Sequence, residues 1–152
     1  MDAIMDLLAG FDPAALLPDI STTLGVLVLI ARIAILALPV ILLVLGLIYF
    51  FRPPKEANHR FGYRTYFGMG SVEAWKYTQW LAGVVYGGLG ALLTVAMLII
   101  GFALNSNDTL SLLTTSAICI VVEIGLTVVA TLAINITALV RYDRDGYRRG
   151  TR

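Results

Sequence analysis

Three long apolar runs constrain this chain more than any other feature. They lie at residues 22–51, 74–104 and 110–140, and few charged residues interrupt them. A helix rises about 1.5 Å per residue, so about 20 apolar residues are enough to cross the hydrocarbon core of a bilayer. Because 59% of the residues are apolar and 14% are charged, the composition does not describe a soluble globule. The runs predict an all-α integral membrane protein with three transmembrane helices.

The distribution of charge predicts how these helices are oriented. Residues 1–21 carry four Asp and neither Lys nor Arg, whereas the first loop and the C-terminal segment are basic. The basic residues of these two segments are Arg52, Lys55, Arg60, Arg64, Arg141, Arg144, Arg148, Arg149 and Arg152. Basic loops stay on the cytoplasmic side of a membrane. We therefore expect the N-terminus outside, and the loop and C-terminus inside, at the cytoplasmic (inner) cell membrane.

The same features divide the chain into three parts. We expect residues 1–20 to form a short interfacial helix, because apolar side chains there precede glycine and proline. Residues 21–140 form the predicted transmembrane domain, in which a cytoplasmic loop at 52–73 joins the first two helices. Residues 141–152 form a basic cytoplasmic tail.

Small residues in the second run predict close helix packing. Gly83, Gly87 and Ala91 recur every four residues and so share one helix face. In membranes such a face lets another helix backbone approach closely. The partner is either another helix of this chain or a larger membrane complex, to which the chain would be an auxiliary subunit.

Two charged residues lie deep inside the apolar runs. With the centres of the first and third runs taken at residues 36 and 125, Arg32 and Glu123 fall at a similar depth. An unpaired charge at that depth costs several kcal/mol. We expect an Arg32–Glu123 pair that docks these helices. The alternative is that Arg32 reaches the outer interface while Glu123 faces a polar cavity or is protonated.

The third run carries a polar stripe. Glu123, Thr127, Thr131 and Asn135 are spaced four apart and lie on one helix face. Lipid offers these side chains no partners, so the stripe should point into the protein or into a homo-oligomer. If it lined a path through an oligomer, the chain would be a small transporter or channel.

Two short motifs lie in the loop and at the start of the second helix. They read Asn58-x-x-x-Gly62-Tyr63-Arg64-Thr65 and Ser71-x-Glu73-x-Trp75, and together with Arg60 they are the candidate site residues. Topology requires basic residues here, but it does not require Asn, Gly or Glu. Ser71 is a suitable N-cap, and Glu73 in the first turn favours the positive end of the helix dipole.

The arginines of the loop are suited to a membrane surface. Guanidinium groups bind phosphate through two parallel hydrogen bonds. We therefore expect Arg60 and Arg64 to contact anionic lipid headgroups. Arg64 could instead pair with Glu73 and clamp the loop over the second helix.

The two motifs resemble the signature of the SdpI family, named for the immunity protein against a bacterial sporulation-delaying toxin. The resemblance extends over about residues 45–105, with departures at Tyr66, where the family usually has proline, and at Thr78-Gln79, where it has asparagine. It implies a multipass bacterial membrane protein. Its function would be resistance to a membrane-active peptide toxin, or scaffolding of a signalling partner at the inner membrane.

Catalytic motifs are missing from the sequence. It has one His and one Cys, and contains no HExxH, GxSxG or Walker sequence. We therefore expect no enzymatic activity, no cofactor, no metal site and no nucleic-acid partner.

Overall fold

The computed structural model describes residues 20–55, 61–103 and 109–149, without the side chains of residues 20–22. These residues form three long helices, α2 (Ile20–Phe51), α3 (Val72–Ala103) and α4 (Thr109–Arg141). Each is long and apolar enough to cross a membrane. The all-α, three-helix prediction is confirmed, and its bounds differ by no more than about two residues. The interfacial helix predicted before Ile20 lies outside the described residues.

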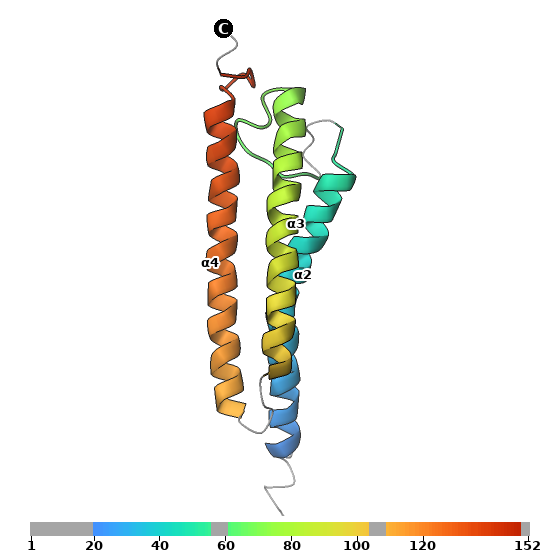
Figure 1. Ribbon diagram of the computed structural model, residues 1–152, viewed down its shortest axis with the longest axis vertical. Coiled ribbons are helices and arrows are strands. Elements are labelled where there is room, and N and C mark those ends of the chain that lie inside the picture. The colour runs from blue at the N-terminus through green and yellow to red at the C-terminus, as the bar shows by residue number, and fades with distance from the viewer. Residues whose placement is uncertain (1–19, 56–60, 104–108, 150–152) are drawn as a thin grey trace, which may run out of the picture.

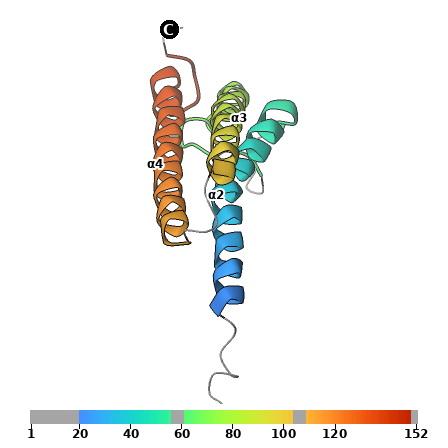
Figure 2. The same ribbon diagram turned by 60° about the horizontal axis from the view of Figure 1, so that its bottom comes forward.

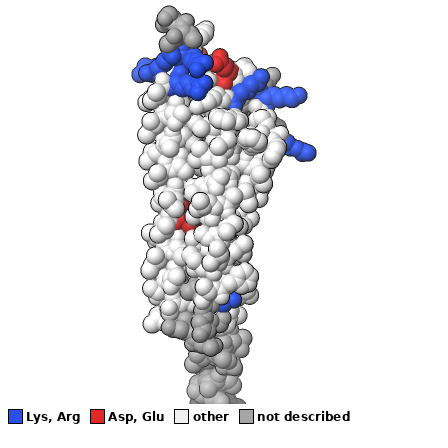
Figure 3. Space-filling view, in the orientation of Figure 1, with Lys and Arg blue, Asp and Glu red and all other residues white. Residues whose placement is uncertain are grey.

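The helices form an up-down-up bundle. α3 runs antiparallel to α2 and α4, so the segment between α2 and α3 and the end of α4 lie together (Figure 1). We call this end of the bundle, made by residues 51–55, 61–72 and 141–149, the loop end. α2 is inclined across α3, whereas α4 runs beside it (Figure 2). Basic side chains gather at the loop end, and the flank of the bundle is almost uncharged (Figure 3).

The backbones of α2 and α3 touch at glycines. A Cβ atom added to Gly46 of α2 would overlap the backbone of Gly87, and one added to Gly90 would overlap the backbone of Leu43. Only a hydrogen atom fits at either position. Such contact gives van der Waals packing that longer side chains would prevent, and this packing is a main source of helix association in lipid.

The predicted small-residue face is correct for two of its three positions. Gly83 packs against Phe50, where an added Cβ would lie 2.7 Å from the backbone nitrogen, and Gly87 packs against Gly46. The third contact is made by Gly90, while Ala91 is exposed. The contact row therefore advances by four and then three residues, as expected where inclined helices cross.

Apolar side chains fill the space between the helices and also cover the outside. The buried core consists of Ile35, Leu42, Tyr49, Ala82, Tyr86, Leu93, Met97, Cys119 and Ile134. The outward faces of the helices carry many exposed Leu, Val and Ile side chains. Such a surface is costly in water and suits lipid, so the bundle is that of a multipass membrane protein.

Candidate functional site

Trp75 and Gly62, one from each motif, are in contact at the loop end. The Trp75 side chain is fully buried, and its indole N–H donates a hydrogen bond of 2.8 Å to the carbonyl of Pro54. Gly62 lies over the ring with φ of 123°, and an added Cβ would be 2.6 Å from Cζ2 of Trp75. Both the backbone angle and the space require glycine. The loop therefore rests on an aromatic side chain of α3.

The next loop residue, Tyr63, is held through its backbone by Gln79. The Tyr63 N–H donates to Oε1 of Gln79 at 2.9 Å, and Nε2 of Gln79 donates to the Tyr63 carbonyl at 2.7 Å. Gln79 is fully buried, so both of its amide groups need these partners. Sequence reasoning treated Gln79 only as a departure from a family pattern. Its spacing of four from Trp75 was the available signal, since it places both side chains on one face.

The side chain of Tyr63 reaches across to α4. Its hydroxyl donates to the carbonyl of Thr131 at 3.4 Å and accepts from Nδ2 of Asn135 at 3.3 Å. Its ring packs edge-on against Tyr86, with centroids 5.5 Å apart, and the Tyr86 hydroxyl lies 2.8 Å from Oγ1 of Thr131. Burial raises the pKa of the Tyr63 phenol above its usual value. Tyr63 thus joins the loop to both α3 and α4.

The polar stripe of α4 divides into two halves. Thr131 and Asn135 contact the loop through Tyr63, and we call these two residues together with Gly62, Tyr63, Trp75 and Gln79 the loop-end site. Glu123 and Thr127 lie deeper in the bundle, where the Thr127 hydroxyl donates to the Glu123 carbonyl at 2.8 Å. Such bonds within the helix satisfy a threonine without any partner from another helix.

Thr65 closes the second part of the loop. Its buried hydroxyl accepts a 2.7 Å hydrogen bond from the Gly68 N–H, and its carbonyl accepts one of 3.2 Å from Met69. Gly68 sits against Thr78 of α3, where an added Cβ would be 2.6 Å from Oγ1. The turn is therefore fixed by its own hydrogen bonds and by its contact with α3.

Ser71 caps α3 as predicted and also binds the tail. Its hydroxyl accepts a hydrogen bond from the Ala74 N–H at 3.1 Å and donates one of 2.7 Å to the carbonyl of Gly146. Gly146 has φ of 77°, and an added Cβ would overlap the backbone at Ser71. The start of α3 and the tail are thus in close contact.

The described part of the tail folds back as a tight hairpin. Oδ1 of Asp143 accepts hydrogen bonds from the N–H groups of Asp145 and Tyr147, at 3.1 and 2.8 Å. The Arg149 N–H then donates to the carbonyl of Arg141 at 2.9 Å. Sequence reasoning described the tail only by its charge. The Asp145-Gly146 dipeptide was the turn signal that could have revealed the hairpin.

The proposed clamp between Arg64 and Glu73 is not formed. Both side chains are exposed, and no ion pair joins them. Arg64 lies on the side of Tyr49 in α2, whereas Glu73 borders a cleft beside the tail hairpin, near Gly146 and Arg148. The loop is held by Gln79 and Trp75 instead. Asn58 and Arg60, the other polar members of the first motif, lie outside the described residues.

Two aromatic side chains of the loop are exposed like Arg64, one beside Tyr49 of α2 and the other beside α4. Phe61 is 43% exposed and Tyr66 is 73% exposed. We call Phe61, Arg64 and Tyr66 the loop surface. It combines one guanidinium group with two rings and is presented by a backbone that the buried residues hold in place.

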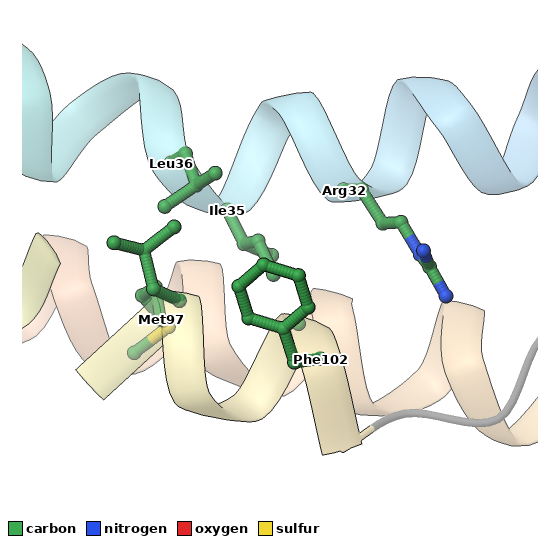
Figure 4. A pocket seen from close by; sticks show the side chains of 7 residues that line it. Arg32, Ile35, Leu36, Met97 and Phe102 are labelled. Atoms are coloured by element: carbon green, nitrogen blue, oxygen red, sulfur yellow. The ribbon is translucent and has the colours of Figure 1, made fainter. Parts of the chain in front are cut away.

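The expected pair between Arg32 and Glu123 is also absent. Glu123 is fully buried, and neither of its carboxylate oxygens has a hydrogen-bond partner in the described part of the chain. Arg32 instead borders a small pocket of about 120 Å³ between α2 and α3. Figure 4 shows its guanidinium group pointing away from Ile35 and Leu36, which line the same pocket.

The contacts between the helices explain why this pair fails to form. Tyr86 bonds Thr131 of α4, and its neighbour Gly87 packs on Gly46 of α2, so Thr131 and Gly46 lie at about the same level. Glu123 precedes Thr131 by 8 residues, whereas Arg32 precedes Gly46 by 14. At about 1.5 Å per residue, Arg32 is about 9 Å farther from the loop end. Estimating depth from the centres of the runs missed this offset.

Comparison with known proteins gives one family. The model of the SdpI/YfhL protein family matches residues 55–137, which is more than half of the chain. Comparisons with curated proteins and with solved structures gave no match. The matched segment contains most of the loop, the whole of α3 and most of α4. It therefore includes Gly62, Tyr63, Trp75, Gln79, Thr131 and Asn135, but neither Pro54 nor the tail hairpin. The chain is therefore a multipass membrane protein that belongs to the SdpI/YfhL family.

Proposed function

We propose that this protein resides in the cytoplasmic membrane and confers resistance to a membrane-active peptide toxin, without enzymatic activity. Its family membership supports a role of this kind. The observation that carries the proposal furthest is the fixed geometry of the loop. Trp75 supports Gly62, and Gln79 holds the Tyr63 backbone, so the loop surface is presented in one conformation.

A fixed loop surface can recognise a peptide at the membrane interface. Ordering a loop on binding costs conformational entropy, and a loop that is already ordered avoids that cost. The Arg64 guanidinium offers paired donors for a carboxylate or phosphate, while Phe61 and Tyr66 offer ring faces. In the predicted orientation this surface faces the inner leaflet, where an inserted peptide or a cytoplasmic signalling partner would meet it.

Resistance can be tested by expressing the protein in a susceptible bacterium and measuring the minimum inhibitory concentration of membrane-active peptides. The wild-type chain should raise it several-fold. The double variant Arg64→Ala/Tyr66→Ala should lose the protection while keeping normal expression, because both side chains are exposed. Arg144→Ala, which removes an exposed charge from the tail hairpin, is the matched control. Full protection by the double variant would rule out the loop surface as the working surface.

A buried glutamate supports a second candidate function, transport by an oligomer. Glu123 lies deep within a transmembrane helix and has no hydrogen-bond partner for either carboxylate oxygen in the described chain. Intramembrane carboxylates of this kind are common at proton or cation sites. Measuring ion flux in proteoliposomes tests this candidate: it requires a flux that Glu123→Gln abolishes and an oligomer in mild detergent.

The auxiliary-subunit alternative loses its original support. It relied on a small-residue face of α3 that would dock on a larger complex. Gly83, Gly87 and Gly90 use that face to pack on α2 of the same chain. A partner complex would have to bind elsewhere.

A further inference from the structure

A second basic site lies beside the tail hairpin. It is a groove of about 470 Å³ at the C-terminal end of α4. Its lining includes Tyr77, Ile136, Val140, Arg141, Arg148 and Arg149. Three guanidinium groups and a phenol ring thus border one end, while aliphatic side chains of α4 border the other. No carboxylate is among the described residues that line it.

Contacts with neighbouring residues hold two of these arginines in place, Arg141 at the end of α4 and Arg149 in the tail hairpin. The Arg141 guanidinium carbon lies 4.1 Å from the centroid of the Tyr77 ring, and the ring itself packs against the buried Tyr142. Arg149 donates from Nε to the Tyr142 carbonyl at 3.1 Å. Nε of Arg141 is buried and has no hydrogen-bond partner in the described chain. The groove therefore holds the positive charge of these two guanidinium groups in place.

Nearby carboxylates are engaged elsewhere. Asp143 uses Oδ1 to accept the two N–H groups that close the hairpin. Glu73 borders the adjoining cleft together with Ser71, Gly146 and Arg148, so Arg148 lies between this carboxylate and the groove. The guanidinium groups of Arg141 and Arg149 thus face no carboxylate within the lining of the groove, and an external anion would complement them.

The aliphatic end of the groove continues onto the lipid-facing side of α4. Val140 is 65% exposed and Ile136, one turn deeper in the membrane, is 57% exposed. A ligand whose anionic group bound the arginines could therefore lay hydrocarbon along these two residues. A soluble anion would use only the arginine end, so the apolar continuation favours a lipid.

We propose that this groove binds the phosphate of an anionic phospholipid, with Arg141 and Arg149 as its donors and with acyl chains along Ile136 and Val140. Guanidinium groups bind phosphate through paired, charge-assisted hydrogen bonds. Occupancy would also hold the tail hairpin against the end of α4. The proposal does not depend on toxin resistance, because the groove and the loop surface share no residue.

Native mass spectrometry of the full-length protein, from micelles doped with phosphatidylglycerol or phosphatidylcholine, tests the site. The wild-type chain should retain phosphatidylglycerol in preference to phosphatidylcholine. Arg141→Gln and Arg149→Gln should each lower that retention by about tenfold, the effect of losing one charge-assisted hydrogen bond. Arg144→Gln, which removes an exposed charge of the same hairpin outside the groove, should retain the lipid as the wild type does.

Thermal unfolding separates loss of the site from loss of the fold. Arg141→Gln leaves the backbone hydrogen bonds of the hairpin intact but removes the guanidinium contact with Tyr77. Its melting temperature without added lipid should therefore be only slightly below that of the wild type, while stabilisation by phosphatidylglycerol disappears. Undiminished retention in both groove variants would overturn the proposal. So would an equal loss in Arg144→Gln, or stabilisation by millimolar inorganic phosphate as large as that by the lipid, which would assign the groove to a soluble anion.

Discussion

The side-chain amide of Gln79 forms two hydrogen bonds with the backbone of Tyr63, one in each direction, and so pairs a loop residue with a transmembrane helix. The two bonds resemble those that a neighbouring β-strand would form with the backbone of Tyr63. Because Gln79 is fully buried, water does not compete for either bond. This pairing, with Trp75 beneath Gly62, converts a polar connection between two helices into a fixed surface.

Gln79→Ala should therefore destabilise the protein by about 2 kcal/mol. The substitution removes both hydrogen bonds and leaves the Tyr63 N–H and carbonyl without their partner, which is costly in a buried position. Thermal unfolding in detergent measures the change. Lys76→Ala, at an exposed position in the same helix, should stay within about 0.5 kcal/mol of the wild type. Equal effects at the two positions would show that the pairing contributes little.

Gly46 and Gly87 face each other between α2 and α3, yet they should respond differently to alanine. A Cβ on Gly46 would overlap the backbone of α3, whereas a Cβ on Gly87 would lie 3.7 Å from the nearest atoms of Gly46, an ordinary contact. We expect Gly46→Ala to destabilise by about 1–3 kcal/mol through overpacking. Gly87→Ala should be neutral or slightly stabilising, because alanine is the better helix former.

Unfolding of both glycine variants under identical conditions provides the measurement, and each is the matched control for the other. If Gly46→Ala were tolerated as well as Gly87→Ala, the helices would be able to move apart at that contact without cost. That result would also mean that the close contact at Gly46 does not determine how α2 crosses α3.

The sequence predicted the fold well, because long apolar runs have few structural solutions in lipid. Helix bounds, the Ser71 cap and the role of Gly83 follow from local patterns of this kind. The sequence predicted poorly which side chains contact each other. Arg64 and Glu73 have opposite charges and are close in sequence, but the loop turns Arg64 toward α2 and Glu73 toward the tail. Such directions depend on tertiary packing, which residue spacing alone does not specify.

The charges within the membrane also show this limit, and they give a further prediction. Because no hydrogen bond joins the Glu123 carboxylate to Arg32, the two residues should contribute independently to stability. Arg32→Gln, Glu123→Gln and the double variant form a double-mutant cycle, and we expect a coupling energy below about 0.5 kcal/mol. Glu123→Gln alone should not destabilise, since it keeps the shape of the side chain and removes an ionisable group from the buried interior of the transmembrane bundle. A coupling energy above about 1 kcal/mol would restore the ion pair.

Alkaline pH should weaken the loop-end site through Tyr63. Burial raises the pKa of this phenol in the folded protein, whereas in the unfolded chain it titrates near pH 10. Below about pH 10 both states keep the proton and the contribution of Tyr63 to stability is complete. Above that pH the unfolded chain releases the proton first, so the stability of the fold falls as pH rises. In the acid range Tyr63 contributes no change, because its phenol is protonated in both the folded and the unfolded chain.

Tyr63→Phe isolates this effect because it keeps the ring on Tyr86 and removes the titrating hydroxyl. At pH 7 the variant should be less stable than the wild type by about 1 kcal/mol, since the hydrogen bonds with Thr131 and Asn135 are lost. Between about pH 9 and 11 its stability should fall less steeply, so that the two curves converge. Tyr66→Phe, at an exposed position, is the matched control and should follow the wild type. Parallel curves for Tyr63→Phe and the wild type would mean that the Tyr63 hydroxyl is not buried against α4.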